Sequence, residues 1–435
     1  MSLVSELKKI DKGKLFSNSA AFTTYDTGFV ALNHLCGFRV NIDGMEKLVT
    51  GIIGGRFITI VGYSGVGKTT FADQLCWSIV NDWPAGDEEA KRKFKEWGMF
   101  IHCDIEQTGV LQRIYDICGV RPDSEDAQRI LLKSEDIYIE DVLKMIDLIC
   151  QAKQNAGDDA KYEIDGSLFG ESGKVKYYVP TVFLLDSLPT FTSKEVNDTT
   201  LEGQMSTNRE VAQISQFYSK CLQRLHKYNI TVVAINHIKT KLKINQYEPE
   251  KPQLMLIRDG ESMPRGQAPT YLASYLFRIN ASGAKASRYT KEENGFDGYY
   301  ATLQVTKTKT SFIGGTLPIV FNKEIGYDPI YSLYEYANSV GMVDGRNPNL
   351  FIKGAESYRF SKKNFRDKFL TDEAFRVAVY AALKPSFESL IGTTSDSSGN
   401  TMQVPIKDLL TDDGNGNLVP VGIVEKEDSS GLKLV

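Results

Sequence analysis

The sequence predicts an α/β protein with a mostly parallel sheet flanked by helices, a small N-terminal helical segment and a small C-terminal domain. Three observations predict it. A glycine-rich loop joins an apolar run to a helical pattern between Phe57 and Val80. Apolar, β-branched runs then alternate with helical patterns as far as Phe321. The runs are apolar throughout, which is typical of parallel strands buried on both faces.

The N-terminal residues predict a short amphipathic helix. Leu3, Leu7 and Ile10 recur at helical spacing and Gly13 follows them, which favours a helix over residues 3–12. A helix of this length is too short to be stable alone, so it needs a surface to pack on. We therefore assign residues 1–50 to an N-terminal segment for subunit contact.

Residues 51–330 are expected to form the core domain. The predicted strands are Phe57–Val61, Met99–Cys103, Val182–Leu185, Thr231–Ile235, Tyr275–Ile279, Tyr300–Val305 and Leu317–Phe321, with helices at Thr69–Val80, Val142–Lys153 and Asn208–Lys227. The last strands lie close together in sequence, so we expect them to pair antiparallel at one edge. Asn155–Tyr178 suits a surface hairpin, and Lys239–Gly266 reads as a long basic and polar loop.

The composition changes after Pro329, so residues 331–435 are assigned to a smaller C-terminal domain. Tyr331–Val340 and Phe365–Leu383 read as helices. From Thr393 the sequence is rich in Ser, Gly and Asp, which predicts a loosely ordered tail.

Composition excludes several classes of protein. Membrane spans need about 20 apolar residues, and no run here approaches that length. The six cysteines are scattered without a C-x-x-C pair and the four histidines lack metal-ligand spacing, so we expect reduced thiols, no zinc site and a cytoplasmic protein. The net charge of −4 does not exclude nucleic acid, because binding depends on a local basic patch.

The glycine-rich loop matches the pattern G-x-x-x-x-G-K-[ST] of phosphate-binding loops. Its residues are Gly62, Tyr63, Ser64, Gly65, Val66, Gly67, Lys68 and Thr69, and we add Thr70 to the nucleotide-binding set. The glycines let backbone N–H groups surround an anion at a helix N-terminus. Lys68 would reach the β- and γ-phosphates, while Thr69 would bind Mg²⁺. The sequence therefore predicts a nucleoside triphosphate site.

Three further polar residues follow predicted strands. Asp186 closes the third strand and is expected beside the phosphate loop, where it would hold Mg²⁺ with Thr69. Glu106 follows the second strand and is our candidate for activating the attacking water, with Asp104 as the competing acid. His237 ends the fourth strand and would sense the γ-phosphate, although a structural histidine is the alternative.

The order of these motifs resembles the RecA recombinase family. The motifs are the phosphate loop, Asp104-Ile105-Glu106, Leu184-Leu185-Asp186-Ser187, Ala234-Ile235-Asn236-His237 and Arg265-Gly266. The Asn-His pair and Gly326-Tyr327-Asp328-Pro329 resemble the phage UvsX-like recombinases. The resemblance runs from about Asn33 to Ile391 and implies a RecA-like P-loop core, with ATP and Mg²⁺ as cofactors.

The resemblance implies further site residues. Glu106 falls at the family's water-activating acid and His237 at its γ-phosphate switch, while Lys307 and Lys309 fall where cations reach the neighbouring subunit's ATP. Thr199–Ser206 and Ile238–Arg265 resemble the two DNA-facing loops. In the second loop, the candidate DNA-binding residues are Lys239, Lys241, Lys243, Arg258 and Arg265. Arg113 and Tyr115 are candidates for stacking on adenine.

The implied function is an ATP-dependent recombinase that forms helical filaments on single-stranded DNA and exchanges strands with double-stranded DNA. Recombination mediators and single-strand-binding proteins are further implied partners, and a phage protein would act in the host cytoplasm. A hexameric DNA helicase with the same core and a nucleotide-dependent DNA-binding scaffold are the alternatives.

Overall fold

The structure is a computed structural model that describes residues 21–42, 44–197, 206–240, 261–281, 287–310 and 314–391, together with two short later strands. Residues 1–391 form one unit and residues 392–435 a second. Within the second unit, β21 (Leu410–Asp412) pairs antiparallel with β22 (Leu418–Pro420). The predicted helix over residues 3–12 lies outside the described residues, as does most of the tail from Thr393. The predicted domain boundaries at residues 50 and 330 stay predictions.

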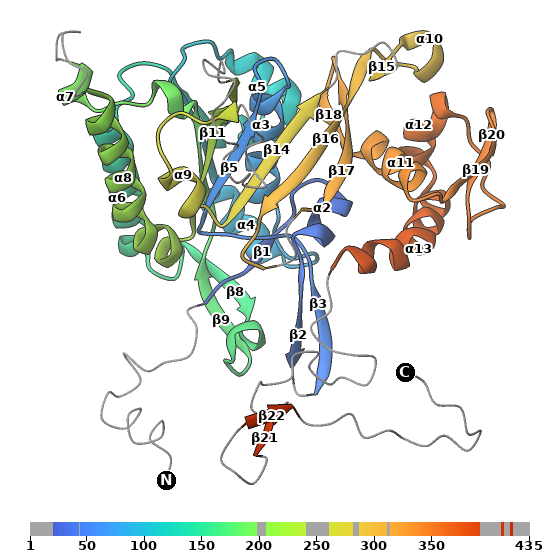
Figure 1. Ribbon diagram of the computed structural model, residues 1–435, viewed down its shortest axis with the longest axis horizontal. Helices are drawn as coiled ribbons and strands as arrows, with labels where there is room; N and C mark the ends of the chain where they lie inside the picture. Colours follow the sequence, from blue (N-terminus) through green and yellow to red (C-terminus); the bar gives the residue numbers. More distant parts are fainter. Residues whose placement is uncertain are drawn as a thin grey trace. The chain divides into compact units, whose positions relative to one another are not determined.

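The main sheet of the first unit confirms the predicted fold class. Its strands lie in the order β18 (Gly326–Asp328), β17 (Thr316–Asn322), β16 (Gly298–Lys307), β14 (Tyr275–Ala281), β5 (Phe57–Gly62), β11 (Ile230–His237), β10 (Thr181–Asp186), β6 (Met99–Asp104) and β7 (Ile130–Lys133) (Figure 1). From β14 to β7 all neighbours are parallel, whereas β14 pairs antiparallel with β16, and β16, β17 and β18 continue antiparallel. The short β15 (Arg288–Tyr289) pairs with β16.

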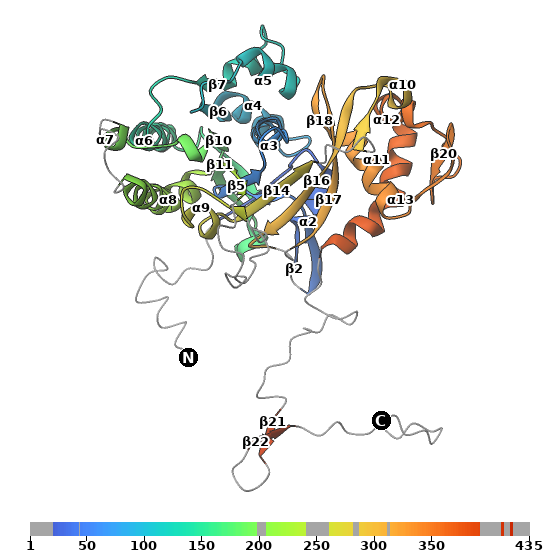
Figure 2. The same ribbon diagram turned by 45° about the horizontal axis from the view of Figure 1, so that its top comes forward.

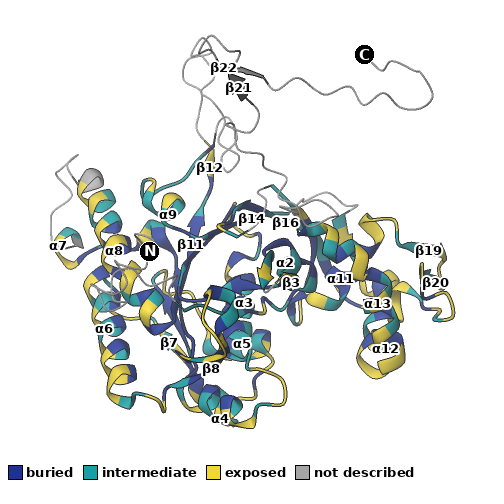
Figure 3. Ribbon diagram, turned by 90° about the horizontal axis from the view of Figure 1, so that it is seen from below, coloured by how far each residue is buried: buried dark blue, intermediate teal, exposed yellow. Residues whose placement is uncertain are grey.

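Side chains alternate between the two faces of this sheet. Ile58 and Leu184 pack into the cluster beneath α3 (Lys68–Val80), α4 (Glu88–Trp97) and α5 (Leu111–Cys118). Phe57 and Phe183, one residue earlier, pack into the cluster beneath α6 (Ile139–Ala156) and α8 (Ser206–Tyr228). Figure 2 shows the strands between these two helix layers, and Figure 3 shows that the strands are buried. The layers hold the carboxyl ends of the parallel strands at one edge, where ligands bind in such folds.

Two hairpins extend from the edge of the sheet at the bottom of Figure 1. β8 (Lys161–Asp165) and β9 (Lys174–Tyr178) pair antiparallel, which confirms the hairpin predicted in residues 155–178. The second hairpin, which was not predicted from the sequence, pairs β2 (Phe38–Ile42) with β3 (Met45–Val49). An ion pair of 2.6 Å between Lys47 and Asp165 links the two hairpins.

The C-terminal helices of the first unit differ in one respect from the prediction. The expected helix Phe365–Leu383 is two helices, α12 (Phe365–Thr371) and α13 (Glu373–Leu390). Asp372 breaks the pattern because its side chain accepts a hydrogen bond from the Phe375 N–H and caps α13. The neighbouring elements are α11 (Pro329–Ser339), α2 (Val30–Leu35), β19 (Val343–Arg346) and β20 (Asn349–Ile352). Further short strands and α-helices are β1 (Thr24–Tyr25), β4 (Ile52–Ile53), α7 (Lys194–Asn197), α9 (Ala268–Tyr271), α10 (Lys291–Asn294), β12 (Lys239–Thr240) and β13 (Glu261–Ser262).

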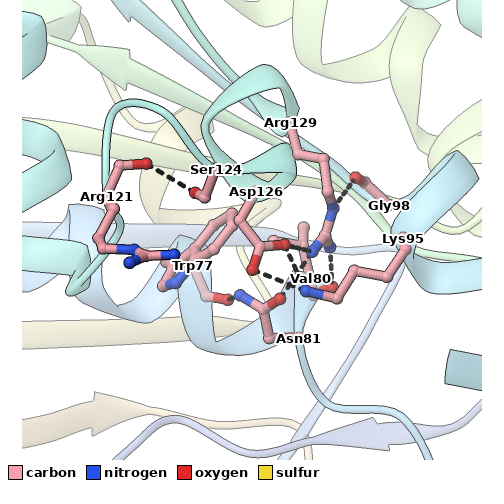
Figure 4. A network of polar contacts seen from close by, with 9 residues as sticks. All are labelled: Trp77, Val80, Asn81, Lys95, Gly98, Arg121, Ser124, Asp126 and Arg129. Atoms are coloured by element: carbon pink, nitrogen blue, oxygen red, sulfur yellow. Dashed lines mark hydrogen bonds and ion pairs between the residues drawn. The ribbon is translucent and has the colours of Figure 1, made fainter.

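A buried arginine fixes the C-terminal end of α3. The Arg129 guanidinium donates to the carbonyls of Val80 and Gly98 and to the side chains of Asn81 and Asp126, at 2.6–2.9 Å (Figure 4). The Val80 carbonyl belongs to the last turn of α3 and has no partner within the helix, so Arg129 satisfies it. These bonds join the end of α3 to the start of β6. They hold in place the helix whose other end carries the phosphate loop.

Lys153 on α6 is buried on the opposite face of the sheet. Its ammonium group donates to the carbonyls of Val179 and Tyr228 at 2.7 and 2.8 Å, and the side chain is 1% exposed. Burial lowers the pKa of Lys153 to about 7. A neutral amine has two N–H groups, which is the number of acceptors around it.

The buried lysine predicts a pH dependence of stability. Between pH 7 and 10 the unfolded chain keeps the Lys153 proton while the folded chain releases it, so stability rises with pH, by up to about 4 kcal/mol across this interval. In Lys153→Met, the urea unfolding midpoint should no longer rise with pH between pH 7 and 10. Lys220→Met, on the exposed face of α8, is the matched control and should keep this rise. If the urea midpoint rises equally with pH in the Lys153 variant and the wild type, Lys153 is not the residue that causes the pH dependence.

Candidate nucleotide-binding site

The phosphate loop lies between the end of β5 and the first turn of α3. Gly65 and Gly67 both have φ of 78°, a conformation that favours glycine. A Cβ at position 67 would also lie 3.0 Å from the Tyr299 hydroxyl. No side chain caps the first turn of α3, so its N–H groups are available to an anion.

Lys68 is the cation of this loop. Its side chain is buried, and Nζ donates a 2.8 Å hydrogen bond to the Tyr63 carbonyl. Burial lowers the pKa of Lys68, and the charges of Asp186 and Glu106 oppose this effect. The position of the lysine inside the loop fits the predicted contact with the β- and γ-phosphates.

Asp186 and Thr69 meet at the carboxyl end of the sheet. The Thr69 hydroxyl donates to Asp186 Oδ2 at 2.6 Å. Burial raises the pKa of Asp186 to about 6. A hydroxyl and a carboxylate are oxygen ligands, which suit a Mg²⁺ ion that keeps several waters. The two side chains therefore fit the predicted metal site, and a bound cation would favour the charged form of Asp186.

The register of β6 and β10 brings the two candidate acids next to Asp186. Asp104 accepts hydrogen bonds from the N–H groups of Thr108 and Gly109, so it holds the turn that follows β6. Glu106 instead lines the cavity in front of the loop, where the Ser187 hydroxyl donates to it. This placement favours Glu106 over Asp104 as the acid that contacts an attacking water.

His237 approaches Glu106 from β11. Its Nε2 lies 3.4 Å from Glu106 Oε1. Burial and the nearby charge of Lys68 lower the pKa of His237 below its usual value, so the ring is neutral at pH 7. The contact is therefore a hydrogen bond from a neutral imidazole, and it joins the candidate acid to the end of β11.

These residues line a cavity of about 400 Å³. The described residues at its wall are Ser64, Gly65, Gly67, Lys68, Thr69, Glu106, Asp186, Ile235, His237, Tyr299 and Phe321. Tyr299 and Phe321 were not predicted from the sequence, and their rings stack with centroids 4.7 Å apart. They come from β16 and β17, and no sequence signal ties those strands to the loop. The volume falls within the usual range of small-ligand sites.

Several predicted nucleotide-site residues lie outside this wall. Thr70 faces Gly326 on β18, and the buried Val66 accepts a hydrogen bond from the Tyr327 hydroxyl through its carbonyl. Gly62 ends β5 against the Ile279 carbonyl, where a Cβ would lie at 2.6 Å. These residues shape the loop from behind rather than form its open surface.

The adenine candidates Arg113 and Tyr115 are also away from the cavity wall. Arg113 donates to the carbonyls of Lys323 and Glu324, and Tyr115 donates to the Ala127 carbonyl. Among the described aromatic residues, Tyr299 and Phe321 are the better placed to contact a base.

Lys307 lies at the far end of β16 from the cavity. It is roughly 25 Å along the strand from Tyr299, at about 3.3 Å per residue, and its ammonium donates to the carbonyls of Thr270 and Tyr271 at 2.7 Å. β16 ends at Lys307, so the exposed Lys309 lies beyond the strand. Neither lysine reaches the phosphate loop of its own subunit.

The predicted DNA-binding residues are only partly described. Lys239 is exposed on β12, while Lys241, Lys243 and Arg258 lie outside the described residues, as do residues 199–205 of the first loop. Arg265 points inward: it donates to the Leu188 and Pro189 carbonyls and pairs with Glu210, and its side chain is 9% exposed. The structure therefore gives Arg265 an anchoring role, and its predicted DNA contact stays untested.

Comparison with known proteins identifies the part of the chain that holds this loop. A family model described as an AAA domain matches residues 37–156, which include the phosphate loop and Glu106. A comparison with curated proteins found no match. Among the described helices, none is both long and apolar enough to cross a membrane. Over residues 37–156 the chain is therefore similar to an AAA domain of the P-loop NTPase type, and its mostly parallel sheet and loop geometry fit a nucleoside triphosphate site.

Proposed function

We propose that the protein is an ATP-dependent recombinase that assembles on single-stranded DNA and exchanges strands with a homologous duplex. The observation that carries the proposal is the contact between Glu106 and His237. His237 ends β11, and the exposed Lys239 follows two residues later at the start of the predicted second DNA loop. One short stretch of chain therefore connects the hydrolytic site to the segment that we assign to DNA.

The site supports hydrolysis of ATP by direct attack of water. Glu106 orients a water and accepts its proton as the oxygen attacks the γ-phosphorus, and the bond from that phosphorus to the β–γ bridging oxygen breaks to release ADP. Lys68 and the N–H groups of the loop stabilise charge on the transferred phosphoryl group. Mg²⁺, held by Thr69 and Asp186, would neutralise the β- and γ-oxygens.

The position of Lys307 supports self-association. Because the lysine lies at the far end of β16, away from the phosphate loop of its own subunit, the predicted contact with a triphosphate would be made in a neighbouring subunit. An arrangement of this kind repeats head to tail, which generates a ring when it closes and a helical filament when it does not.

Electron micrographs of the full chain with single-stranded DNA, Mg²⁺ and ATP should show open helical filaments. The same preparation should exchange strands between a labelled single strand and a homologous duplex, and a duplex of unrelated sequence is the control. Closed rings that separate strands would favour the helicase alternative. Assembly without strand exchange, with the same slow hydrolysis with and without DNA, would favour the scaffold.

A further inference from the structure

Tyr63, the second residue of the phosphate loop, has a side chain that does not line the nucleotide cavity. Its hydroxyl donates a 2.7 Å hydrogen bond to Glu261 Oε1 on β13. Tyr63 is 39% exposed, and the bond to Glu261 raises its pKa. A tyrosine is not needed here for phosphate binding, because the loop pattern accepts any residue at this position.

Glu261 is a fixed acceptor for this bond. Arg278 on β14 donates to both of its carboxylate oxygens at 2.7 Å, and the two residues are 1% and 8% exposed, respectively. Arg278 is held in turn by β5, since its Cα pairs with Val61 in the sheet. A buried pair of this geometry contributes little net stability but fixes positions firmly, because separating its charges would be costly.

The same loop also holds the strand that pairs with β13. Ile238, directly before β12, donates its N–H to the Gly62 carbonyl at 3.2 Å, and β12 pairs antiparallel with β13. Consecutive residues of the phosphate loop therefore hold both members of the β12–β13 pair. These two strands border residues 241–260, which carry most of the predicted DNA-binding cations.

Lys68 links Tyr63 to the phosphate site. Its Nζ donates to the Tyr63 carbonyl, and an ammonium group has two further protons for a bound phosphate. One side chain would then hold both the phosphate and the backbone of Tyr63. The hydroxyl of the same tyrosine is bonded to Glu261 on β13.

We propose that Tyr63 and Glu261 couple occupancy of the phosphate loop to the position of the β12–β13 pair, and thus to the predicted DNA-binding segment. Tyr63 acts as a positioning residue. The inference rests on the proposed function for its DNA consequence, whereas the coupling itself can be measured without DNA.

Hydrogen exchange of the full chain tests the coupling, with Mg²⁺ and a non-hydrolysable ATP analogue as the probe. In the wild type, the analogue should change the hydrogen-exchange rates of the β12 and β13 amides by about tenfold. This factor corresponds to the free energy of about one hydrogen bond to a charged group. In Tyr63→Phe this change should disappear, while the amides of α3 still respond to the analogue. Tyr271→Phe removes an exposed hydroxyl on α9 and should behave as the wild type.

A second measurement separates the coupling from a merely structural role. The ratio of hydrolysis with single-stranded DNA to hydrolysis without it should fall toward one in Tyr63→Phe, whereas Tyr271→Phe should keep the wild-type ratio. An equal response of β12 and β13 in Tyr63→Phe and the wild type would overturn the coupling. A wild type in which α3 itself does not respond would overturn nucleotide binding, on which the inference depends. A wild type without DNA stimulation would overturn only the recombinase assignment.

Discussion

Lys68→Ala should reduce the rate of nucleotide hydrolysis by about 100- to 1,000-fold, the usual cost of removing one preorganised donor from a transition state. The ammonium group donates to the Tyr63 carbonyl inside the loop, and the charges of Asp186 and Glu106 favour its protonated form. No neighbouring cation of the described cavity wall can replace it. Phosphate release by the purified variant and binding of a fluorescent ATP analogue would measure the loss.

The fold of Lys68→Ala should stay intact, because the side chain makes one hydrogen bond to the loop and takes no part in the core. Circular dichroism and the thermal midpoint check this. Lys91→Ala, which loses only an exposed pair with Glu88 on α4, is the control and should hydrolyse at the wild-type rate. Near-normal turnover in Lys68→Ala would contradict the assignment of this loop as the phosphate site.

Glu106→Gln should slow hydrolysis by about 100- to 10,000-fold, the range that a general base contributes. The amide keeps the shape of the side chain and can still accept from Ser187 and His237, so the nucleotide should bind with wild-type affinity. Single-turnover hydrolysis, measured beside the dissociation constant, separates the chemical step from binding.

Asp104→Asn tests the competing acid. Asp104 holds the turn over residues 104–109 through backbone bonds, so its variant should lower the thermal midpoint more than the chemical rate. The opposite pattern, with normal hydrolysis in Glu106→Gln and a large loss in Asp104→Asn, would mean that Asp104 is the catalytic acid.

The arrangement of Glu106, His237 and Lys239 gives a reason why hydrolysis and DNA binding are proposed to act together. Burial lowers the pKa of His237, so the hydrogen bond to Glu106 is donated by a neutral imidazole at pH 7. Tyr63 adds a second link from the opposite end of the predicted DNA segment. The two described strands that flank this segment in sequence, β12 and β13, are therefore both connected to the phosphate loop, through Ile238 and Glu261.

Local sequence determined the elements that carry the hydrolytic site. The phosphate loop, the apolar strands before Glu106 and Asp186, and α3 follow from patterns that act within about ten residues, such as a glycine at positive φ or an uninterrupted β-branched run. The meeting of Asp104, Asp186 and His237 could also be expected, since parallel strands end at one edge. The break at Asp372 was missed because a capping aspartate and a helix-interior aspartate look alike in sequence.

Only the tertiary structure decided which distant residues join the site and which leave it. Tyr299 and Phe321 reach the cavity because β16 and β17 are added to the sheet edge beside β14, a pairing that depends on long-range register. Arg265 turns inward because the carbonyls of Leu188 and Pro189 and the carboxylate of Glu210 converge there, although its sequence context favours an exposed cation. Tyr63 finds Glu261 nearly 200 residues away. Side-chain contacts of this kind arise from packing between elements, and the periodicity of one element does not encode them.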